Sequence, residues 1–288
     1  MKAVPSRSTK QGLAGRVVVV TGAASGIGRS TVRAFAARGA DLALADIDRA
    51  GLAGAEEELR GGGHRVLARR VDVSQAADVE GFANEVYGLL GRVDVLVNNA
   101  GIAINGFVED MDLDDWRRIF AVNVWGVIHG CHFFYPRMAR QRGGGHIVNV
   151  ASMAALGPLP ASAAYGASKS AVLGLSESLR IEAARRGVFV TTICPGVVAT
   201  GIGRTLKMVT GARGRSAEET RRTIDALMQR HGVRPEHVAE AIVKAVETRA
   251  RLVPVGKEAH AIDVLRRLHR GVYDAVMARA LALLLGTK

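Results

Sequence analysis

Short apolar runs alternate with longer amphipathic segments along this chain, and this alternation limits the folds that it can adopt. The runs are RVVVVTG (16–22), DLALAD (41–46), RVLARRVDV (65–73), VDVLVNNAG (93–101), GHIVNVAS (145–152), VFVTTICPG (188–196) and RLVPV (251–255). Most of them are continuously apolar, which is typical of strands that are covered on both faces. We therefore predict that each run is a buried strand.

The segments between the runs have helical periodicity, as in GRSTVRAFAARG (28–39) and AADVEGFANEVYGLLG (76–91). A strand, a helix and a following parallel strand form a right-handed crossover, and repeated crossovers build a parallel sheet with helices on both faces. We predict an α/β fold of this kind. Residues 1–256 are expected to form one domain, and residues 257–288 a C-terminal helical extension.

The composition indicates a globular protein without a disulfide framework, a secretory signal or a membrane span. The chain has 288 residues, 48% of them hydrophobic, so it can bury a large core. Its 2 cysteines are too few for a disulfide framework. The basic N-terminus lacks the apolar stretch of a secretory signal, and no apolar run is long enough for a membrane span. We therefore expect a cytoplasmic protein.

The net charge of +12 raises the question of a nucleic-acid partner. Most of this excess lies after residue 200, and neither a zinc-finger spacing nor a basic strip with interleaved aromatic residues is present. The His129, Cys131 and His132 cluster has a spacing that suits no metal pair, and we interpret it as helix packing or an oligomer surface. We expect no nucleic-acid partner and no metal site.

The first run is followed directly by TGAASGIG (21–28), whose glycines are Gly22, Gly26 and Gly28. Glycine allows a tight turn and the close approach of a pyrophosphate, which then lies at the positive end of the next helix. Many glycine clusters are only turns. This one follows a predicted strand and opens a predicted helix, and that context favours a dinucleotide site.

A dinucleotide site of this kind also needs an acidic residue at the end of the second strand. Asp46 in LALADID lies 18 residues after Gly28, where a carboxylate can accept the hydroxyls of the adenosine ribose. The same charge repels a 2′-phosphate, so NAD is favoured over NADP. An ordinary aspartate at a strand end is the alternative interpretation.

Three motifs in this order, TGAASGIG (21–28), VNNAG (97–101) and YGASK (165–169), resemble those of the short-chain dehydrogenase/reductase family. The likeness spans residues 13–256. It implies a Rossmann-type doubly wound fold with a mostly parallel seven-stranded sheet. It also implies four catalytic residues, which are Asn123, Ser152, Tyr165 and Lys169.

The resemblance further implies contacts to the cofactor. Ser25, Gly26 and Ile27 would meet the pyrophosphate, and Asp72 and Val73 would lie beside the adenine. The remaining positions are Asn99 near the adenosine ribose, Pro195, Val198 and Thr200 on the nicotinamide side, and Tyr165 and Lys169 at the nicotinamide ribose.

Tyr165 and Lys169 lie four residues apart and share one face of a helix. A free phenol has a pKa near 10. We expect the neighbouring ammonium to lower the pKa of Tyr165 toward the operating pH, where a general acid or base is most effective. The alternative, a tyrosine in the core beside a lysine stem, does not account for the small residues around the pair. Ser152 would donate to the substrate oxygen, and the resemblance implies that Asn123 holds a water linking Lys169 to solvent.

These features predict an NAD(P)-dependent oxidoreductase that interconverts a secondary alcohol and a ketone. Two alternatives remain, namely a catalytically silent NAD-binding regulatory protein and an enzyme similar to sugar-nucleotide epimerases or dehydratases. Cys194 lies near the predicted nicotinamide site, but no motif supplies the paired histidine that an acyl-transfer role needs. The family resemblance also implies a homodimer or homotetramer.

The substrate is expected to lie between segments 153–162 and 200–232. The first segment, MAALGPLPAS, is apolar and favours a hydrophobic alcohol or ketone. The second is basic, and its cations could recognise an anionic substrate or form a solvated helix face. Those cations are Arg204, Lys207, Arg213, Arg215, Arg221 and Arg222.

The C-terminal extension carries apolar residues every three or four positions, which predicts one helical stripe. Its members are Ile262, Leu265, Leu268, Val272, Val276, Ala280 and Leu283. Gly271 is expected to divide the segment into two helices. We expect the stripe to pack on its own subunit near the substrate cleft or on a neighbouring subunit. An anionic membrane surface is the alternative, and otherwise no membrane partner is expected.

Overall fold

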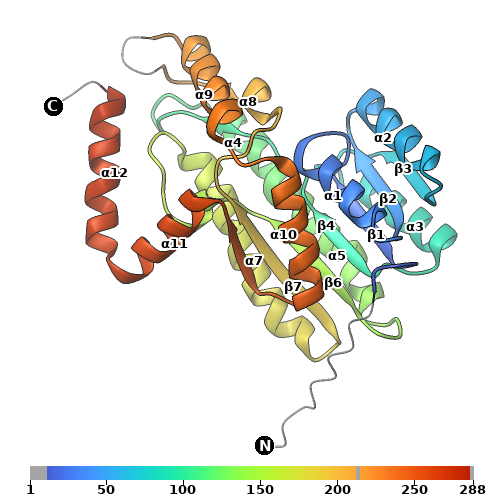
Figure 1. Ribbon diagram of the computed structural model, residues 1–288. Coiled ribbons are helices and arrows are strands. Elements are labelled where there is room, and N and C mark those ends of the chain that lie inside the picture. Colours follow the sequence, from blue (N-terminus) through green and yellow to red (C-terminus); the bar gives the residue numbers. More distant parts are fainter. Residues whose placement is uncertain (1–11, 212–214, 286–288) are drawn as a thin grey trace, which may run out of the picture.

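The computed structural model describes residues 12–211 and 215–285, with side chains up to residue 282. Its centre is a parallel sheet with the strand order β3-β2-β1-β4-β6-β7-β9 (Figure 1). The strands are β1 (Val17–Thr21), β2 (Asp41–Asp46), β3 (Val66–Arg70), β4 (Val95–Asn98), β6 (Gly145–Val150), β7 (Val188–Pro195) and β9 (Leu252–Val255). Each of the predicted strands is present, and the predicted fold class is confirmed.

Successive residues of a strand point to opposite faces, which explains why the runs are apolar throughout. In β1, Val18 and Val20 pack into one core with Phe35, whereas Val17 and Val19 pack into a second core on the other face. Both faces of the sheet are therefore buried.

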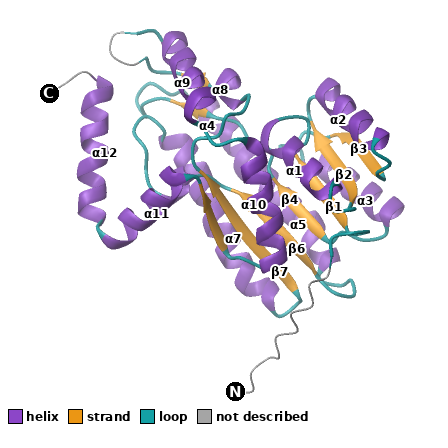
Figure 2. Ribbon diagram, in the orientation of Figure 1, coloured by secondary structure: helices purple, strands orange, loops and turns teal. Residues whose placement is uncertain are grey.

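Helices cover the two faces in separate layers (Figure 2). The first core contains side chains of α1 (Gly26–Ala36), α2 (Arg49–Gly61) and α10 (Pro235–Thr248). The second contains side chains of α3 (Ala76–Leu90), α5 (Gly126–Met138) and α7 (Ala163–Ala184). This arrangement is a doubly wound α/β fold.

The sequence did not indicate two features beside the carboxyl ends of the strands. A short parallel pair joins β5 (Ile104–Asn105) to β8 (Lys207–Met208), although about a hundred residues separate the two strands. The π-helix η1 (Ala121–Trp125) lies between α4 (Leu113–Phe120) and α5. Segment 200–232 also contains α8 (Ile202–Thr205) and α9 (Ala217–His231).

The C-terminal extension forms α11 (Lys257–Leu268) and α12 (Arg270–Leu285), as two helices (Figure 1). The break lies at His269, whose φ of −144° and ψ of 69° are not helical, and Gly271 belongs to α12. The predicted position of the break was therefore wrong by two residues.

The predicted apolar stripe is only partly covered. Ile262 and Leu265 are half-buried, whereas the other members with described side chains, from Leu268 to Ala280, are exposed. Leu283 lies outside the described side chains. Among the described side chains of α12, the buried one is Tyr273, which is 1% exposed and does not belong to the stripe. A tyrosine thus anchors the extension where the periodicity indicated aliphatic residues.

Among the described residues, no helix combines the length and the apolar content that a membrane crossing requires.

Candidate active site

The predicted site residues gather at the carboxyl ends of β1, β2, β3, β4, β6 and β7 and on the neighbouring η1 and α7. The strand order reverses between β1 and β4, and in open α/β sheets ligands bind at such a switch point. Residues that are far apart in the sequence meet here because the carboxyl ends of parallel strands share one edge.

The glycine turn after β1 has no room for side chains. Gly22 has a φ of +66°, and a Cβ there would lie 2.8 Å from Asn99 Nδ2. A Cβ at Gly28 would lie 1.9 Å from the Gly22 carbonyl oxygen. Gly26 has a φ of +51°, and a Cβ there would be 3.2 Å from Thr200 Cγ2. Only glycine fits this geometry, and the turn presents bare backbone at the N-terminus of α1.

Asp46 lies at the end of β2, directly beside the turn. Its Oδ2 accepts a hydrogen bond from the Ala24 backbone N–H (2.9 Å), and its Oδ1 accepts one from the Asp48 N–H (3.0 Å). Each carboxylate oxygen has a further lone pair. Asp46 therefore shapes the turn and can also accept hydrogen bonds from a ribose.

Asn99 and Thr21 join β4 to the glycine turn. Asn99 Nδ2 donates to the Thr21 and Gly22 carbonyl oxygens at 2.9 and 3.2 Å. The Thr21 hydroxyl oxygen accepts hydrogen bonds from the Asn99 and Ala100 N–H groups at 3.0 and 3.1 Å. The amide nitrogen of Asn99 is thus used to hold the turn.

Asp72 and Val73 follow β3 and are held locally. Asp72 Oδ1 accepts hydrogen bonds from the backbone N–H and hydroxyl of Ser74 at 3.0 and 2.7 Å. His129 Nδ1 lies 2.9 Å from the Val73 carbonyl oxygen, and the imidazole donates because a carbonyl can only accept. His129 therefore positions this loop, a role that the sequence did not reveal.

Thr200 lies across the glycine turn from α1. It follows β7, which ends at Pro195, and its N–H donates to the Val198 carbonyl oxygen (2.9 Å). Val198 also pairs with Val233 in an isolated bridge. The methyl group of Thr200 faces Gly26. The segment after β7 thus lies against the glycine turn.

Ser152 lies near Tyr165. Ser152 follows β6 and caps the short helix α6 (Met153–Leu156), where its hydroxyl oxygen accepts a hydrogen bond from the Ala154 N–H (3.2 Å). The Ser152 side chain also lies close enough to the phenol of Tyr165 on α7 to lower its pKa. A serine and a tyrosine from two different elements therefore point to one position.

Lys169 is buried one helical turn after Tyr165. Its Nζ donates to the Val150 carbonyl oxygen (3.1 Å) and lies 5.9 Å from the centre of the Tyr165 ring. A Cβ at Gly101 would be 3.3 Å from Lys169 Nζ and 3.2 Å from Asn123 Oδ1. The last glycine of VNNAG thus allows the lysine and the asparagine to approach each other.

Asn123 is fully buried in the π-helix η1. Its Oδ1 accepts a hydrogen bond from the Ile102 N–H (2.8 Å), and its Nδ2 donates to the Ile102 carbonyl oxygen (3.0 Å). Nδ2 also donates to Ser168 Oγ (3.1 Å), which in turn donates to the Tyr165 carbonyl oxygen (2.8 Å). π-Helical turns are frequent at functional sites, and this one directs Asn123 toward α7.

Ser168 was not predicted from the sequence. Its place three residues after Tyr165, within YGASK, was the available signal, because positions i and i+3 of a helix are neighbours.

The ionisation of the Tyr165–Lys169 pair differs from the expectation. Burial raises the pKa of Tyr165, the hydrogen bond from Ser152 opposes this, and the nearby Cys194 thiol raises it further. Burial also lowers the pKa of Lys169 to about 8. In the protein alone the desolvation of both groups outweighs their attraction, so Tyr165 stays protonated at neutral pH.

Cys194 lies beside these groups but is not reactive. Burial raises the pKa of its thiol to about 12, so the nucleophilic thiolate is scarce. This agrees with the absence of an acyl-transfer motif in the sequence.

The cations of segment 200–232 are largely engaged within the protein. Lys207 Nζ lies 2.6 and 2.7 Å from the carboxylate oxygens of the buried Asp115 on α4. Arg221 and Arg222 both pair with Glu218 at 2.8 Å. Arg213 lies outside the described residues. These contacts favour a structural role for the cations over recognition of an anionic substrate.

A glycine turn at the switch point of a parallel sheet, with a serine, a tyrosine and a lysine beside it, defines a dinucleotide-binding protein of the Rossmann type. The chain matches the family model for short chain dehydrogenase over residues 16–209, and it belongs to this family.

Individual relatives and a solved structure agree with this assignment. The chain is 40% identical over 273 residues to the probable oxidoreductase EphD of Mycobacterium tuberculosis, covering 92% of this chain but 46% of EphD. It thus spans about half the length of that relative. It is 43% identical over 204 residues to the D-threitol dehydrogenase of Mycolicibacterium smegmatis (70% of this chain, 76% of that protein). The crystal structure of a short chain dehydrogenase/reductase from Burkholderia phymatum in complex with NAD has a TM-score of 0.81 at 32% identity, covering 93% of this chain and 96% of that one.

Proposed function

We propose that this protein is an NAD(H)-dependent oxidoreductase that interconverts a secondary alcohol and a ketone. The observation that carries the proposal is the proximity of the Ser152 side chain to Tyr165, with Lys169 Nζ 5.9 Å from the centre of the Tyr165 ring. The relatives named as oxidoreductase and as D-threitol dehydrogenase support the same class of reaction.

A bound nicotinamide would supply the hydride to a ketone or accept it from an alcohol. In the reducing direction the protonated Tyr165 donates its proton to the carbonyl oxygen of the substrate, and Ser152 donates a hydrogen bond to the same oxygen. In the oxidising direction Tyr165 must first lose its proton. With a pKa of about 8, Lys169 stays mostly protonated at neutral pH, and its ammonium would stabilise the phenolate that forms.

The residues around the glycine turn fit a dinucleotide. Gly22 and Gly28 leave no room for a Cβ, Gly26 has a φ of +51°, and α1 begins directly at the turn. Ser25, Gly26 and Ile27 would meet the pyrophosphate there, and Asp46 would accept the adenosine ribose hydroxyls. Its carboxylate beside Ala24 N–H disfavours a 2′-phosphate, so we propose NAD as the preferred cofactor over NADP.

The surroundings of Tyr165 favour an apolar substrate. Its ring packs against a small core formed by Ile104, Ile119 and Ala164, with Trp116 and Val209 at the edge. These side chains come from β5, α4, α7 and the segment after β8, so the apolar patch includes Val209 of the predicted substrate segment 200–232.

We further propose that residues 1–256 act as one cofactor-binding and catalytic domain carrying the extension 257–288, and that the protein assembles as a homodimer or homotetramer. The relation to short chain dehydrogenases supports both statements.

The test is a screen of secondary alcohols with NAD⁺ and of ketones with NADH, followed by nicotinamide absorbance. We expect turnover with at least one apolar substrate, and faster turnover with NAD(H) than with NADP(H). Tight NADH binding without turnover of any substrate would instead identify a regulatory protein, and the proposed activity would be wrong.

A further inference from the structure

The segment 156–162 connects α6 to α7, and therefore Ser152 to Tyr165. It contains Pro158 and Pro160, which have no N–H group to donate. Ala161 has a φ of +52°, which is uncommon for a residue with a side chain. At its far end the segment is bonded to the body of the protein, where the Gly106 N–H donates to the Ala161 carbonyl oxygen (2.9 Å). The carbonyl groups at its near end must accept hydrogen bonds from other parts of the protein.

The C-terminal extension supplies two of these donors. Arg266 of α11 donates from its guanidinium to the Leu156 carbonyl oxygen (2.5 Å). Tyr273 of α12 donates from its hydroxyl to the Pro158 carbonyl oxygen (2.6 Å). Consecutive helices of the extension thus bind the segment at two carbonyl groups two residues apart.

Gly157, between these two carbonyl groups, allows the close approach. A Cβ at this position would lie 2.5 Å from the Tyr273 hydroxyl oxygen and 2.7 Å from Ile262 Cγ2. The Tyr273 side chain is 1% exposed. The missing side chain of Gly157 therefore leaves the space that the buried Tyr273 side chain occupies.

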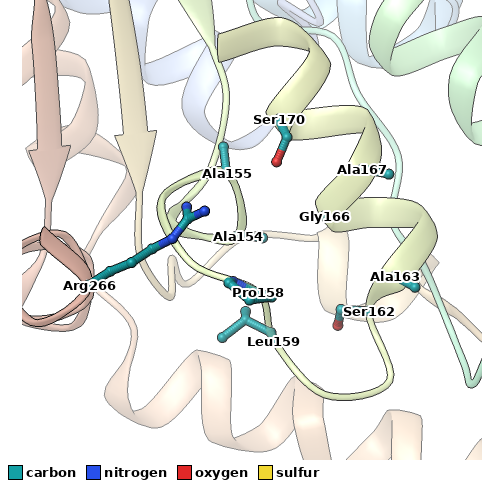
Figure 3. Close-up of a pocket in the computed structure, with 10 residues that line it drawn as sticks. All are labelled: Ala154, Ala155, Pro158, Leu159, Ser162, Ala163, Gly166, Ala167, Ser170 and Arg266. Carbon is teal, nitrogen blue, oxygen red and sulfur yellow. The ribbon is translucent and has the colours of Figure 1, made fainter. Parts of the chain in front are cut away.

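The outer face of α7 gives the segment little support. A cavity of about 210 Å³ lies between the segment, the small residues Ala163, Gly166 and Ala167 of α7, and the Arg266 side chain (Figure 3). Side chains that line a cavity lack contacts on that side. The near end of the segment is consequently held by the extension, whereas its far end is bonded to Gly106 and to Gly166 of α7.

We propose that the C-terminal extension is part of the substrate site, and that Arg266 and Tyr273 are positioning residues that hold segment 156–162 for substrate binding. This inference rests on the proposed oxidoreductase function. Arg266 and Tyr273 contact neither Ser152 nor Tyr165 in any described interaction. They therefore act on the substrate through the backbone of segment 156–162, which joins Ser152 to Tyr165.

The test compares Tyr273→Phe and Arg266→Met with matched controls elsewhere. Tyr87→Phe removes a buried hydroxyl on α3 that has no partner among the described residues, and Arg267→Met removes a guanidinium that pairs with Asp263 on α11 itself. Steady-state kinetics on a substrate from the screen, NADH binding and hydrogen exchange of the Gly157, Leu159 and Ala161 amides are measured for each protein.

For Tyr273→Phe and Arg266→Met we expect KM to rise about fivefold, as the loss of one hydrogen bond implies. kcat and NADH affinity should stay within about twofold, and the amides of the segment should exchange faster. Arg266→Lys, which keeps a donor, should recover part of the KM. Both controls should match the wild type in all three measurements.

Unchanged exchange in both variants, or a fall in kcat with no rise in KM, would overturn the inference. A wild-type protein that turns over no substrate would contradict the proposed function instead. In that case the exchange of the three amides still decides whether the extension holds the segment.

Discussion

The phenol of Tyr165 is subject to two opposing effects at the scale of one residue. Burial favours the neutral phenol, while the hydrogen bond from Ser152 favours the phenolate. Burial is the larger effect, so the residue is a proton donor at neutral pH. The sequence suggested that the pKa of Tyr165 is lowered, because the spacing reveals the neighbouring lysine but not the burial of the phenol away from solvent.

We expect Tyr165→Phe to remove nearly all turnover and to leave NADH affinity within a few-fold of the wild type. The ring remains in place, and only the proton that the reaction needs is lost. Initial rates and NADH titration measure the two quantities. Activity of about a tenth or more in this variant would show that another group carries the proton.

Asp46 provides a test of cofactor preference. We expect kcat/KM to be higher with NAD⁺ than with NADP⁺, because the carboxylate repels a 2′-phosphate. Asp46→Ala should narrow this ratio, although it also removes the acceptor of the Ala24 and Asp48 N–H groups. Asp48→Ala, which removes the acceptor of the first N–H groups of α2, serves as the control. Equal values for the two cofactors in the wild type would contradict the assignment.

His146 is buried on β6 beside Thr191, and burial lowers the pKa of its imidazole to about 4. The unfolded chain, with a pKa near 6.5, binds this proton first as the pH falls. The free energy of unfolding should therefore be unaffected by this group above about pH 6.5. It should fall by up to about 3 kcal/mol as the pH drops to about 4.

Urea denaturation between pH 7 and pH 4 measures this contribution. His146→Gln should be less sensitive to acid than the wild type, whereas His231→Gln, on the exposed side of α9, should follow the wild type. Parallel curves for His146→Gln and the wild type would mean that other groups control the acid response.

At the scale of elements, the pair of Lys207 and Asp115 joins β8 to α4. Asp115 is 6% exposed and Lys207 is 49% exposed, so solvent screens only one side of the ion pair. The pair fixes the segment after β7 beside the small β5–β8 sheet. This segment is therefore attached to the body of the protein at more than its two ends.

We expect Lys207→Met to lower the free energy of unfolding by about 1–2 kcal/mol, because it leaves a buried carboxylate without its partner. The double variant with Asp115→Asn should lose less than the sum of the two single variants. Arg117→Met, which breaks the exposed pair with Asp114, should change stability by less than about 0.5 kcal/mol. Additive single effects would show that the pair contributes nothing to stability.

At the scale of the whole molecule, α11 and α12 form an arm beside the sheet (Figure 1). Val264, Leu268, Val272 and Val276 lie four residues apart on this arm and are 54%, 69%, 53% and 47% exposed. If these side chains contact a second subunit, the protein is an oligomer in solution. If they contact a membrane surface, the protein binds vesicles.

We expect light scattering to give the mass of a dimer or tetramer for the full chain, and the full chain to stay in solution with anionic vesicles at physiological salt. Arg267 pairs with Asp263, which offsets one of the charges that the arm offers to lipid headgroups. Deletion of 257–288 should lower thermal stability, because it removes Tyr273 from its contact with Pro158. Vesicle binding that is lost on deletion, with unchanged mass and stability, would support the membrane alternative.

The sequence by itself determined the strands, the layers and the positions of Tyr165 and Lys169, because these depend on short-range periodicity. An apolar run buried on both faces reads as a strand, and positions i and i+4 share a helix face wherever the helix lies. The glycine turn was recognisable for the same reason, since its steric demand lies within eight residues.

Only the tertiary structure decided which partners meet. The β5–β8 pair, the contact of Tyr273 with Pro158 and the ion pair of Lys207 with Asp115 join residues about a hundred positions apart. Periodicity shows which face of a helix is apolar, but the cover of that face and the burial of a charge depend on the packing of distant elements. The ionisation of Tyr165 belongs to this group, because its pKa is set mainly by the depth at which the fold buries it.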